Sequence, residues 1–224
     1  MRDEDDVWAV VPTLNEAAGI GALVRALRAE VPVVLVVDGG STDNTVALAE
    51  AAGARVLQAA RGRGGQLRAG AAIAQGAVIW FVHADSEVPA GAGAALRRAA
   101  QSADWGCFEV ALIGGGRRLR FAAAWMNARA RWGRSATGDM GLWVRRSLLD
   151  QIGGFPPISL CEDLAFCAAA RPAGTMAVVP LPLGTSARRW HQNGVNRTIL
   201  RMWLVRSLFY AGVEPTVLAR LYGA

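Results

Sequence analysis

The chain lacks lysine, and all 24 of its basic residues are arginine. Without lysine it cannot form a Schiff base with a substrate or use the lysine of a P-loop. It can still bind phosphate, because the planar guanidinium group donates hydrogen bonds to two oxygens at once. The arginines are scattered and the net charge is +6, so we expect no nucleic-acid partner.

Cysteine and histidine are also scarce, with three and two residues among 224. Cys107, Cys161 and Cys167 form no CxxC pair, which indicates a reducing compartment without a disulfide framework. No apolar stretch of membrane-spanning length is free of charge. The acidic start, Met1 to Asp6, lacks the basic residues and apolar run of a signal peptide. We therefore predict a cytoplasmic protein without a spanning helix.

Hydrophobic residues make up 53% of the chain, which is ample for one buried core. In the first hundred residues, short apolar runs alternate with alanine-rich helical segments, and this alternation predicts a parallel, doubly wound α/β sheet. The expected strands are Val7–Val11, Val33–Val37, Arg55–Gln58 and Val78–Val82. The expected helices are Ala17–Ala29, a helix from an N-cap at Ser41 or Thr42 to Ala52, Gln66–Ala74 and a helix that begins at Pro89.

The second half of the chain is less regular. Its expected strands are Trp105–Leu112, Gly141–Val144, Met176–Val179 and Thr185–Trp190. Its expected helices are Arg117–Arg131, Ser147–Ile152, Glu162–Ala170 and a largely helical end, Val195–Tyr222, with a break at Pro215.

Two carboxylates stand where predicted strands end. Asp38 precedes Gly39 and Gly40, and it could accept hydrogen bonds from a nucleotide base or ribose while the glycines let a ligand approach. Asp85 follows the fourth strand, where one carboxylate and two phosphates can hold Mg²⁺ or Mn²⁺. Ligands of open α/β sheets bind at these strand ends, so a nucleotide site is expected there. The alternatives are a turn residue for Asp38 and a helix N-cap for Asp85.

Two arginine-bearing segments could contact phosphate. The loop Arg61–Gly65 carries two guanidinium groups, but it follows the third strand and lacks the strand-end acid of a dinucleotide fingerprint. Arg188 or Arg189 could neutralise a leaving diphosphate. His83 and His191 favour a polar site in the same regions. For both segments the alternative is a solvated surface.

Glu162 and Asp163 stand at a predicted helix start after the turn Gly153–Pro157. The helix dipole stabilises negative charge there, which by itself explains the pair. In the functional interpretation, one carboxylate deprotonates an acceptor hydroxyl while the other orients it.

Taken together and in this order, these segments resemble the family 2 glycosyltransferases, which have the GT-A fold. The segments that carry the resemblance are Pro12-Thr13-Leu14-Asn15-Glu16, Asp38 with Gly39-Gly40-Ser41-Thr42-Asp43, the helix with Gln66 and Gly70, His83-Ala84-Asp85, Gly153-Gly154-Phe155 and Glu162-Asp163. In the family, the first two segments cradle the base and ribose. An Asp-x-Asp motif binds a divalent metal, and a Glu-Asp motif supplies the base for an inverting displacement.

The resemblance implies a three-layer α/β sandwich with a mostly parallel central sheet and a C-terminal helical segment. Residues 1–224 would form one catalytic domain, with a nucleotide-binding half at 1–100, an acceptor half at 101–194 and a helical segment at 195–224. The implied reaction moves a sugar from a nucleotide-diphosphate sugar to a small hydroxyl-bearing acceptor.

The resemblance also implies roles for single residues. Asp163 would take the acceptor proton, with Glu162 beside it. His83 replaces the first aspartate of the metal motif, so Asp85, joined by His191, would hold Mg²⁺ or Mn²⁺. The implied donor-binding residues are Pro12, Thr13, Asn15, Glu16, Asp38, Arg61, Arg63, Gln66, His83, Ala84, Arg188 and Arg189.

The His-Ala-Asp form, the segment Arg188-Arg189-Trp190 and the small size further resemble a bacterial subgroup associated with arsenosugar biosynthesis and radical-SAM genes. Two other functions stay open. One is a nucleotidyltransferase of similar fold, although residues 12–16 lack its glycine-rich basic loop. The other is a non-catalytic protein that binds nucleotide sugars.

The helix expected from Val195 to Ala211 is apolar on two sides. One side carries Leu200, Trp203, Leu204, Leu208 and Ala211, and the other carries Met202, Val205 and Phe209. Since the sheet can cover only one side, we expect the second to meet a partner subunit, an adjacent helix such as Arg117–Arg131, or the inner membrane surface. Packing within the chain is the plainer alternative.

Overall fold

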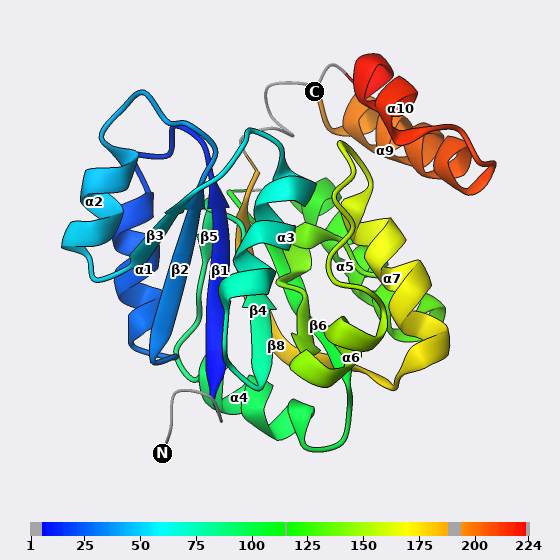
Figure 1. The fold of residues 1–224 in the computed structure, drawn as a ribbon. Helices are drawn as coiled ribbons and strands as arrows, with labels where there is room; N and C mark the ends of the chain where they lie inside the picture. Colours follow the sequence, from blue (N-terminus) through cyan, green and yellow to red (C-terminus); the bar gives the residue numbers. More distant parts are fainter. Residues whose placement is uncertain (1–5, 115, 188–193, 223–224) are drawn as a thin grey trace.

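The structure is a computed structural model that describes residues 6–114, 116–187 and 194–222 (Figure 1). Its strands are β1 (Val7–Thr13), β2 (Val33–Asp38), β3 (Arg55–Gln58), β4 (Val78–Phe81), β5 (Ser86–Glu87), β6 (Trp105–Ile113), β7 (Trp143–Arg145) and β8 (Met176–Ser186). Its helices are α1 (Ile20–Arg28), α2 (Thr45–Ala51), α3 (Arg63–Ile73), α4 (Ala92–Ala100), α5 (Arg117–Gly133), the 3₁₀-helix η2 (Gly138–Met140), α6 (Arg146–Gln151), α7 (Glu162–Ala173), α9 (Val195–Tyr210) and α10 (Pro215–Tyr222).

In the described part of the chain, the strands form one mixed sheet in the order β3-β2-β1-β4-β7-β6-β8-β5. Strands β1 to β4 are parallel, as the alternation of strands and helices predicts. Strand β7 runs antiparallel to both of its neighbours, β4 and β6, whereas β6 and β8 are parallel to each other. The carboxyl ends of β1, β2, β4 and β8 therefore share one edge of the sheet with the amino end of β7.

Helices cover both faces of the sheet, which makes three layers (Figure 1). On one face, α1 and α2 share a cluster with alternate residues of β1 and β2, and α4 packs against β8. On the other face, α3 packs against the intervening residues of β1 and β2, α5 packs against β6, and α6 packs against β7 and α7. Because both faces are covered, the central strands are continuous apolar runs, as expected of buried parallel strands.

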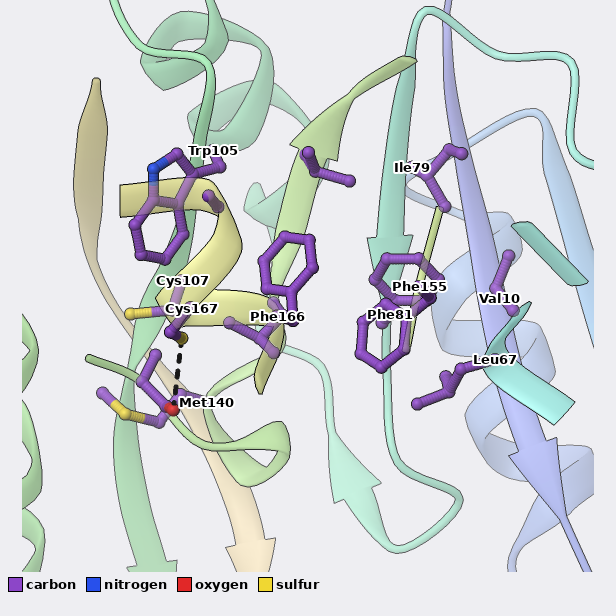
Figure 2. Packing of buried hydrophobic residues seen from close by; sticks show 14 of the residues in the cluster. Val10, Leu67, Ile79, Phe81, Trp105, Cys107, Met140, Phe155, Phe166 and Cys167 are labelled. Carbon is purple, nitrogen blue, oxygen red and sulfur yellow. Dashed lines mark hydrogen bonds between the residues drawn. The ribbon is translucent and has the colours of Figure 1, made fainter. Parts of the chain in front are cut away.

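Phe155 of the Gly153-Gly154-Phe155 segment packs in this core. The Phe155 ring stacks on Phe166 of α7 at 5.2 Å between centroids and meets Phe81 of β4 edge-on at 4.7 Å (Figure 2). This row of rings holds the start of α7 next to the end of β4. The helix start with Glu162 and Asp163 is thereby brought to the edge where β4 ends.

Two predicted helix starts are wrong, one through a local hydrogen bond and the other through a distant one. Helix α2 begins at Thr45 rather than after Ser41 or Thr42, since the Asp43 carboxylate accepts the Thr45 backbone N–H at 3.0 Å. Helix α4 begins at Ala92, three residues after Pro89. The Glu30 carboxylate accepts hydrogen bonds from the backbone of Gly91 and Gly93 at 2.8 and 2.9 Å, a contact that local sequence cannot reveal.

Two further boundaries differ from the prediction. Helix α3 begins at Arg63, so part of the expected Arg61–Gly65 loop forms its first turn. The expected strand piece at 176–179 and the first two residues of the piece at 185–190 belong to one strand, β8, which ends at Ser186, and residues 188–190 lie outside the described residues. A register shift opposite Phe108 and Glu109 passes over Pro180, which is where a proline without an N–H is tolerated.

For the side of α9 that carries Met202, Val205 and Phe209, the plainer alternative holds, because this side packs within the chain. Met202 packs against the main core, and Val205 and Phe209 pack with Leu218 of α10 against the start of α7. This face therefore meets the rest of the chain. The exposed apolar face carries Leu200, Trp203 and Leu204 instead. Among the helices that the structure describes, none joins the length to the apolar character that a bilayer crossing requires.

Candidate functional site

The loops that follow β1 and β2 are bonded to each other at the shared edge. The Asn15 backbone N–H donates to Ser41 Oγ at 2.8 Å, and the Thr42 N–H donates to Asn15 Oδ1 at 2.9 Å. The Glu16 N–H donates to Thr45 Oγ1 at 2.8 Å. Asn15 has a φ of +55°, a left-handed conformation that asparagine tolerates better than most residues. The two predicted donor-binding segments thus form one rigid rim.

Asp38 and Gln66 lie beneath this rim and are almost fully buried. The Asp38 carboxylate accepts the backbone N–H groups of Gly40 and Ser41 at 3.0 and 2.9 Å. Burial alone would raise the pKa of Asp38, but the hydrogen bond from the Ser41 hydroxyl and these backbone hydrogen bonds outweigh it and keep the pKa below its usual value. The Gln66 amide donates to the carbonyls of Thr13 and Val37 at 2.9 and 2.8 Å. Both side chains therefore shape the ends of β1 and β2.

Four carboxylates act electrostatically on the Arg63 guanidinium at the same edge. Arg63 Nη1 lies 3.3 Å from Glu162 Oε1. Burial lowers the pKa of Arg63, but the negative charges of Glu162, Asp139, Asp163 and Asp85 outweigh it, so the pKa lies above its usual value. These residues come from α3, η2, the start of α7 and the loop after β4. The tertiary structure thus gathers acids that are far apart in the sequence.

His83 joins the same cluster from the end of β4. Its Nδ1 lies 3.1 Å from Asp139 Oδ1, and its ring lies against the backbone of Gly138. A Cβ at position 138 would stand 2.3 Å from His83 Nε2, so only glycine fits there. The Thr185 hydroxyl at the end of β8 donates to the Asp139 carbonyl at 3.0 Å. The turn that carries Asp139 is therefore held between β4 and β8.

Close backbone contact also positions Arg63. A Cβ on Gly64 would stand 2.4 Å from the Ile158 carbonyl oxygen and 2.8 Å from that of Pro156. Glycine at this position lets the first turn of α3 rest against the loop that leads to α7. Arg63 consequently reaches Glu162.

The two acids at the start of α7 differ in their surroundings. Glu162 is 4% exposed, and burial together with the neighbouring Asp163 raises its pKa, although Arg63 acts in the opposite direction. Asp163 is more accessible. Its Oδ2 accepts the Gly138 N–H at 3.0 Å, and its Oδ1 accepts the Leu164 N–H at 2.7 Å. Asp163 is thus held in a fixed orientation with room for a hydroxyl to approach.

A divalent cation would find only a partial site in the described residues. Within residues 6–114, 116–187 and 194–222, no three His, Cys, Asp or Glu side chains are grouped so as to hold a metal ion. The Asp85 carboxylate accepts no hydrogen bond from another described residue, and it is a hard oxygen ligand. Mg²⁺ is commonly held by one or two carboxylates together with substrate phosphates. Asp85 fits that arrangement.

The other predicted site residues are distributed as follows. Pro12 and Thr13 are buried at the end of β1, Arg61 is exposed before α3, and Ala84 is half-buried beside Asp85. Three predicted residues, Arg188, Arg189 and His191, lie outside the described residues. The strand before them, β8, ends at the edge of the sheet where the acids gather.

Asp139 is a site residue that the sequence patterns did not reveal. The strand-end rule considers only the carboxyl ends of strands, whereas Asp139 precedes the amino end of β7. Because β7 is antiparallel to β4, that end lies at the ligand-binding edge. A Thr-Gly-Asp turn immediately before a strand is the signal that could have indicated it.

A hollow of about 580 Å³ lies elsewhere, between the amino ends of β6 and β8. Asp104, Arg134 and Arg171 line it. Ligands of α/β sheets bind at the carboxyl ends of the strands, and this hollow contains none of the acids around Arg63. We therefore place the candidate active site at the acidic cluster.

Known proteins match this chain in sequence and in fold. Residues 8–155 match the family described as Glycosyl transferase family 2. Glycosyltransferase AglJ of Haloferax volcanii is 46% identical over 70 residues, which is 30% of this chain and 23% of AglJ.

Solved structures share the fold at about one-fifth sequence identity. TarS of S. aureus (residues 1–349) has a TM-score of 0.64 and 21% identity over 81% of this chain and 60% of its own. Glucosyl-3-phosphoglycerate synthase of Mycobacterium tuberculosis has a TM-score of 0.62 and 21% identity over 94% of this chain and 81% of its own. The chain spans less than two-thirds of both AglJ and the TarS structure. The match to the family model, which covers most of the chain, shows that this protein belongs to glycosyl transferase family 2.

Proposed function

We propose that the chain transfers a sugar from a nucleotide-diphosphate sugar to a small hydroxyl-bearing acceptor, with inversion at the anomeric carbon. The observation that carries this proposal is the acidic cluster around Arg63, at the carboxyl ends of parallel strands. Family membership supports it, and so do related structures solved with nucleotide sugars. TarS was crystallised with UDP-GlcNAc, and the mycobacterial synthase with UDP-glucose, Mn²⁺ and phosphoglyceric acid.

The donor would lie across the rim formed by the β1 and β2 loops. Asn15, Glu16 and Asp38 would face its base and ribose, with Pro12, Thr13 and Gln66 supporting the strand ends beneath. Arg61 and Arg63, with His83 and Ala84, would face the diphosphate side. Arg188 or Arg189 would neutralise the leaving diphosphate, because each guanidinium can bind two phosphate oxygens.

A divalent cation would be held by Asp85 together with the donor phosphates, and His191 could complete its ligands. When bound, Mg²⁺ or Mn²⁺ would neutralise charge on the leaving diphosphate. The mycobacterial synthase has been crystallised with each of these ions and UDP. The role of this chain's own residues is to place Asp85 at the end of β4 with its carboxylate available.

In the chemical step, the acceptor hydroxyl oxygen would attack the anomeric carbon from the face opposite the diphosphate. The new C–O bond forms as the bond to the diphosphate oxygen breaks, and the nucleoside diphosphate leaves with that electron pair. Asp163 would take the hydroxyl proton. Glu162, held by Arg63, would orient the site, since it is too buried to receive an acceptor directly.

Product analysis tests the proposal. The purified chain is incubated with a panel of nucleotide sugars, Mn²⁺ and hydroxyl acceptors, and nucleoside diphosphate and pyrophosphate are measured separately. Release of nucleoside diphosphate with a glycosylated product supports sugar transfer. Pyrophosphate release would indicate a nucleotidyltransferase. Donor binding in a thermal-shift screen without turnover of any acceptor would indicate a binding protein. The subgroup associated with arsenosugar biosynthesis and a cytoplasmic location stay predictions.

A further inference from the structure

An exposed aromatic and aliphatic surface extends over two helices outside the active site. We call it the α5–α9 surface and define it by Phe121, Trp125, Trp132, Leu200, Trp203 and Leu204. The Trp132 side chain is 85% exposed, that of Phe121 74% and that of Leu200 71%. Large apolar side chains scattered singly on a surface need no explanation, but a contiguous group of them marks an interaction site.

The six side chains form one surface rather than two. The Trp125 and Trp203 rings stack with 6.1 Å between their centroids, which joins α5 to α9. Phe121 and Trp132 stand four and seven residues from Trp125, so they share its side of α5. Leu200 and Leu204 flank Trp203 on α9, whose opposite face is packed against the core. Figure 1 shows α9 and α10 projecting beside the α/β body.

Every charged side chain on α5 and α9 is an arginine, because the two helices contain no Asp or Glu. Arg117 and Arg118 precede Phe121 by four and three residues, and Arg197 precedes Leu200 by three. All three arginines are exposed beside the apolar side chains. An apolar surface bordered by cations complements a bilayer that carries anionic headgroups, where tryptophan also favours the interface.

A second copy of the chain is a poorer occupant. A two-fold contact places the same surface on both sides of an interface. The arginines of α5 and α9 would then face one another without any acidic residue of these helices to pair with. Like charges that are brought together in this way oppose association.

We propose that the α5–α9 surface docks the protein on an anionic membrane surface, with the aromatic side chains inserted at the headgroup level and the arginines paired with lipid phosphates. None of the six residues that define the surface, and none of the three arginines, is among the proposed donor, metal or catalytic residues. Docking can therefore hold whether or not sugar transfer does.

Vesicle flotation tests the proposal with the purified full chain. The wild type should bind vesicles of phosphatidylcholine with 30% phosphatidylglycerol, bind pure phosphatidylcholine much more weakly and dissociate at high salt. The triple variant Arg117→Gln, Arg118→Gln, Arg197→Gln should lose roughly fivefold in affinity for each arginine, or on the order of 100-fold in all. The matched control removes three exposed arginines from α1 and α4, with Arg25→Gln, Arg28→Gln and Arg98→Gln, and should bind almost as well as the wild type.

A second pair of variants tests the apolar contribution. Phe121→Ser with Trp203→Ser should weaken vesicle binding by at least about tenfold. Leu48→Ser with Ile73→Ser, which alters exposed apolar residues of α2 and α3, should not. Thermal melting shows whether each variant is folded.

Several results would overturn the proposal. They are absence of wild-type binding to anionic vesicles, equal binding to neutral ones, or equal losses in the control variants. Sedimentation showing a dimer that Phe121→Ser with Trp203→Ser dissociates, without vesicle binding, would assign the surface to a second copy instead. Because the wild-type measurement needs no variant, misfolding of a variant cannot hide the answer.

Discussion

Replacing Asp163 with asparagine separates a catalytic role from a structural one. Both oxygens of this carboxylate accept backbone N–H groups, from Gly138 at 3.0 Å and Leu164 at 2.7 Å. Asparagine keeps the shape but exchanges one acceptor for an NH₂ donor. Whichever way the amide turns, a donor then faces one of the two N–H groups. The variant therefore loses one hydrogen bond as well as the proposed base.

The two losses differ in size. An unmade hydrogen bond at a half-buried site costs about 1–2 kcal/mol of folding stability. A typical domain with about 5–15 kcal/mol of stability stays roughly 99% folded after that loss. Loss of a general base lowers the rate by about 10²–10⁴-fold, which is about 3–5 kcal/mol of transition-state stabilisation. A small loss of folded protein cannot imitate so large a loss of rate.

The assay measures release of nucleoside diphosphate under saturating donor and acceptor, and calorimetry measures donor affinity. We expect Asp163→Asn to lose about 10²–10⁴-fold in kcat while its donor Kd changes less than about threefold. The matched control is Asp104→Asn. Asp104 accepts two hydrogen bonds from Thr175 at 2.8 Å, at the amino end of β6 and away from the site. Since both bonds go to one oxygen, Oδ2, the asparagine carbonyl can accept them, so this variant removes a carboxylate charge outside the site and should keep its activity. If Asp163→Asn retains a tenth of wild-type kcat, or if Asp104→Asn is equally inactive, Asp163 is not the base.

Three other changes have defined outcomes. Asp85→Ala should remove most of the donor affinity and the dependence of that affinity on Mn²⁺. Calorimetry with and without EDTA measures both. Equal donor affinity of the wild type with and without EDTA would refute a metal site. Glu162→Gln should raise the melting temperature at neutral pH, because burial and Asp163 raise the pKa of Glu162, so that its ionised form lowers the stability of the fold. This gain in melting temperature should vanish as the pH falls through the raised pKa toward the usual value of a glutamate. A gain that does not depend on pH would contradict the explanation. Burial would raise the pKa of Asp6, but hydrogen bonds from Arg97 and Val7 lower it overall, so the ionised carboxylate stabilises the fold at neutral pH and this stabilisation is lost on acidification. Asp6→Asn should therefore lower the free energy of unfolding in urea by about 1 kcal/mol at pH 7 and leave it unchanged below the lowered pKa. An equal loss at both pH values would show that ionisation of Asp6 does not stabilise the fold.

The first half of the fold could be predicted from sequence because its signals are local. Apolar runs rich in β-branched residues predict β1, β2 and β4, and alternation with helices predicts their parallel order. Parallel strands end at one edge, so Asp38 and Asp85 were expected close to the same ligand. The sequence does not show that the side chains of Asp38 and Gln66 form hydrogen bonds with backbone groups at the ends of β1 and β2. Those hydrogen bonds join residues up to 53 positions apart, and they depend on the strands being paired already.

The second half could be predicted only in part, because its site residues are placed by tertiary contacts. Reversal of β7 brings Asp139 to the ligand-binding edge, a result of strand direction that no local pattern contains. The acids at the start of α7 reach the same place because Phe155 packs between Phe81 and Phe166, and because Gly64 lets α3 approach the preceding loop. A pair of acids at a helix start is common for reasons of the helix dipole alone. Glu162 lies next to Arg63, which is 99 residues earlier in the chain and belongs to α3. This contact distinguishes the acids Glu162 and Asp163 from an ordinary helix cap.

The charges of the cluster set a condition on the donor binding that we propose. Four carboxylates face one guanidinium and one imidazole, so the site is negative before a diphosphate enters it. In the proposed function, each additional phosphate charge would be balanced by a cation at Asp85, by Arg188 or Arg189, or by both. Because His83 replaces a carboxylate, this chain has one ligand fewer for a metal and one negative charge fewer to balance. Donor affinity should consequently depend on the arginines more, and on the metal less, than in a site with two aspartates. Comparing the Mn²⁺ dependence of His83→Asp with that of the wild type measures this shift: a steeper dependence in the variant supports it, and an unchanged dependence excludes His83 as its cause.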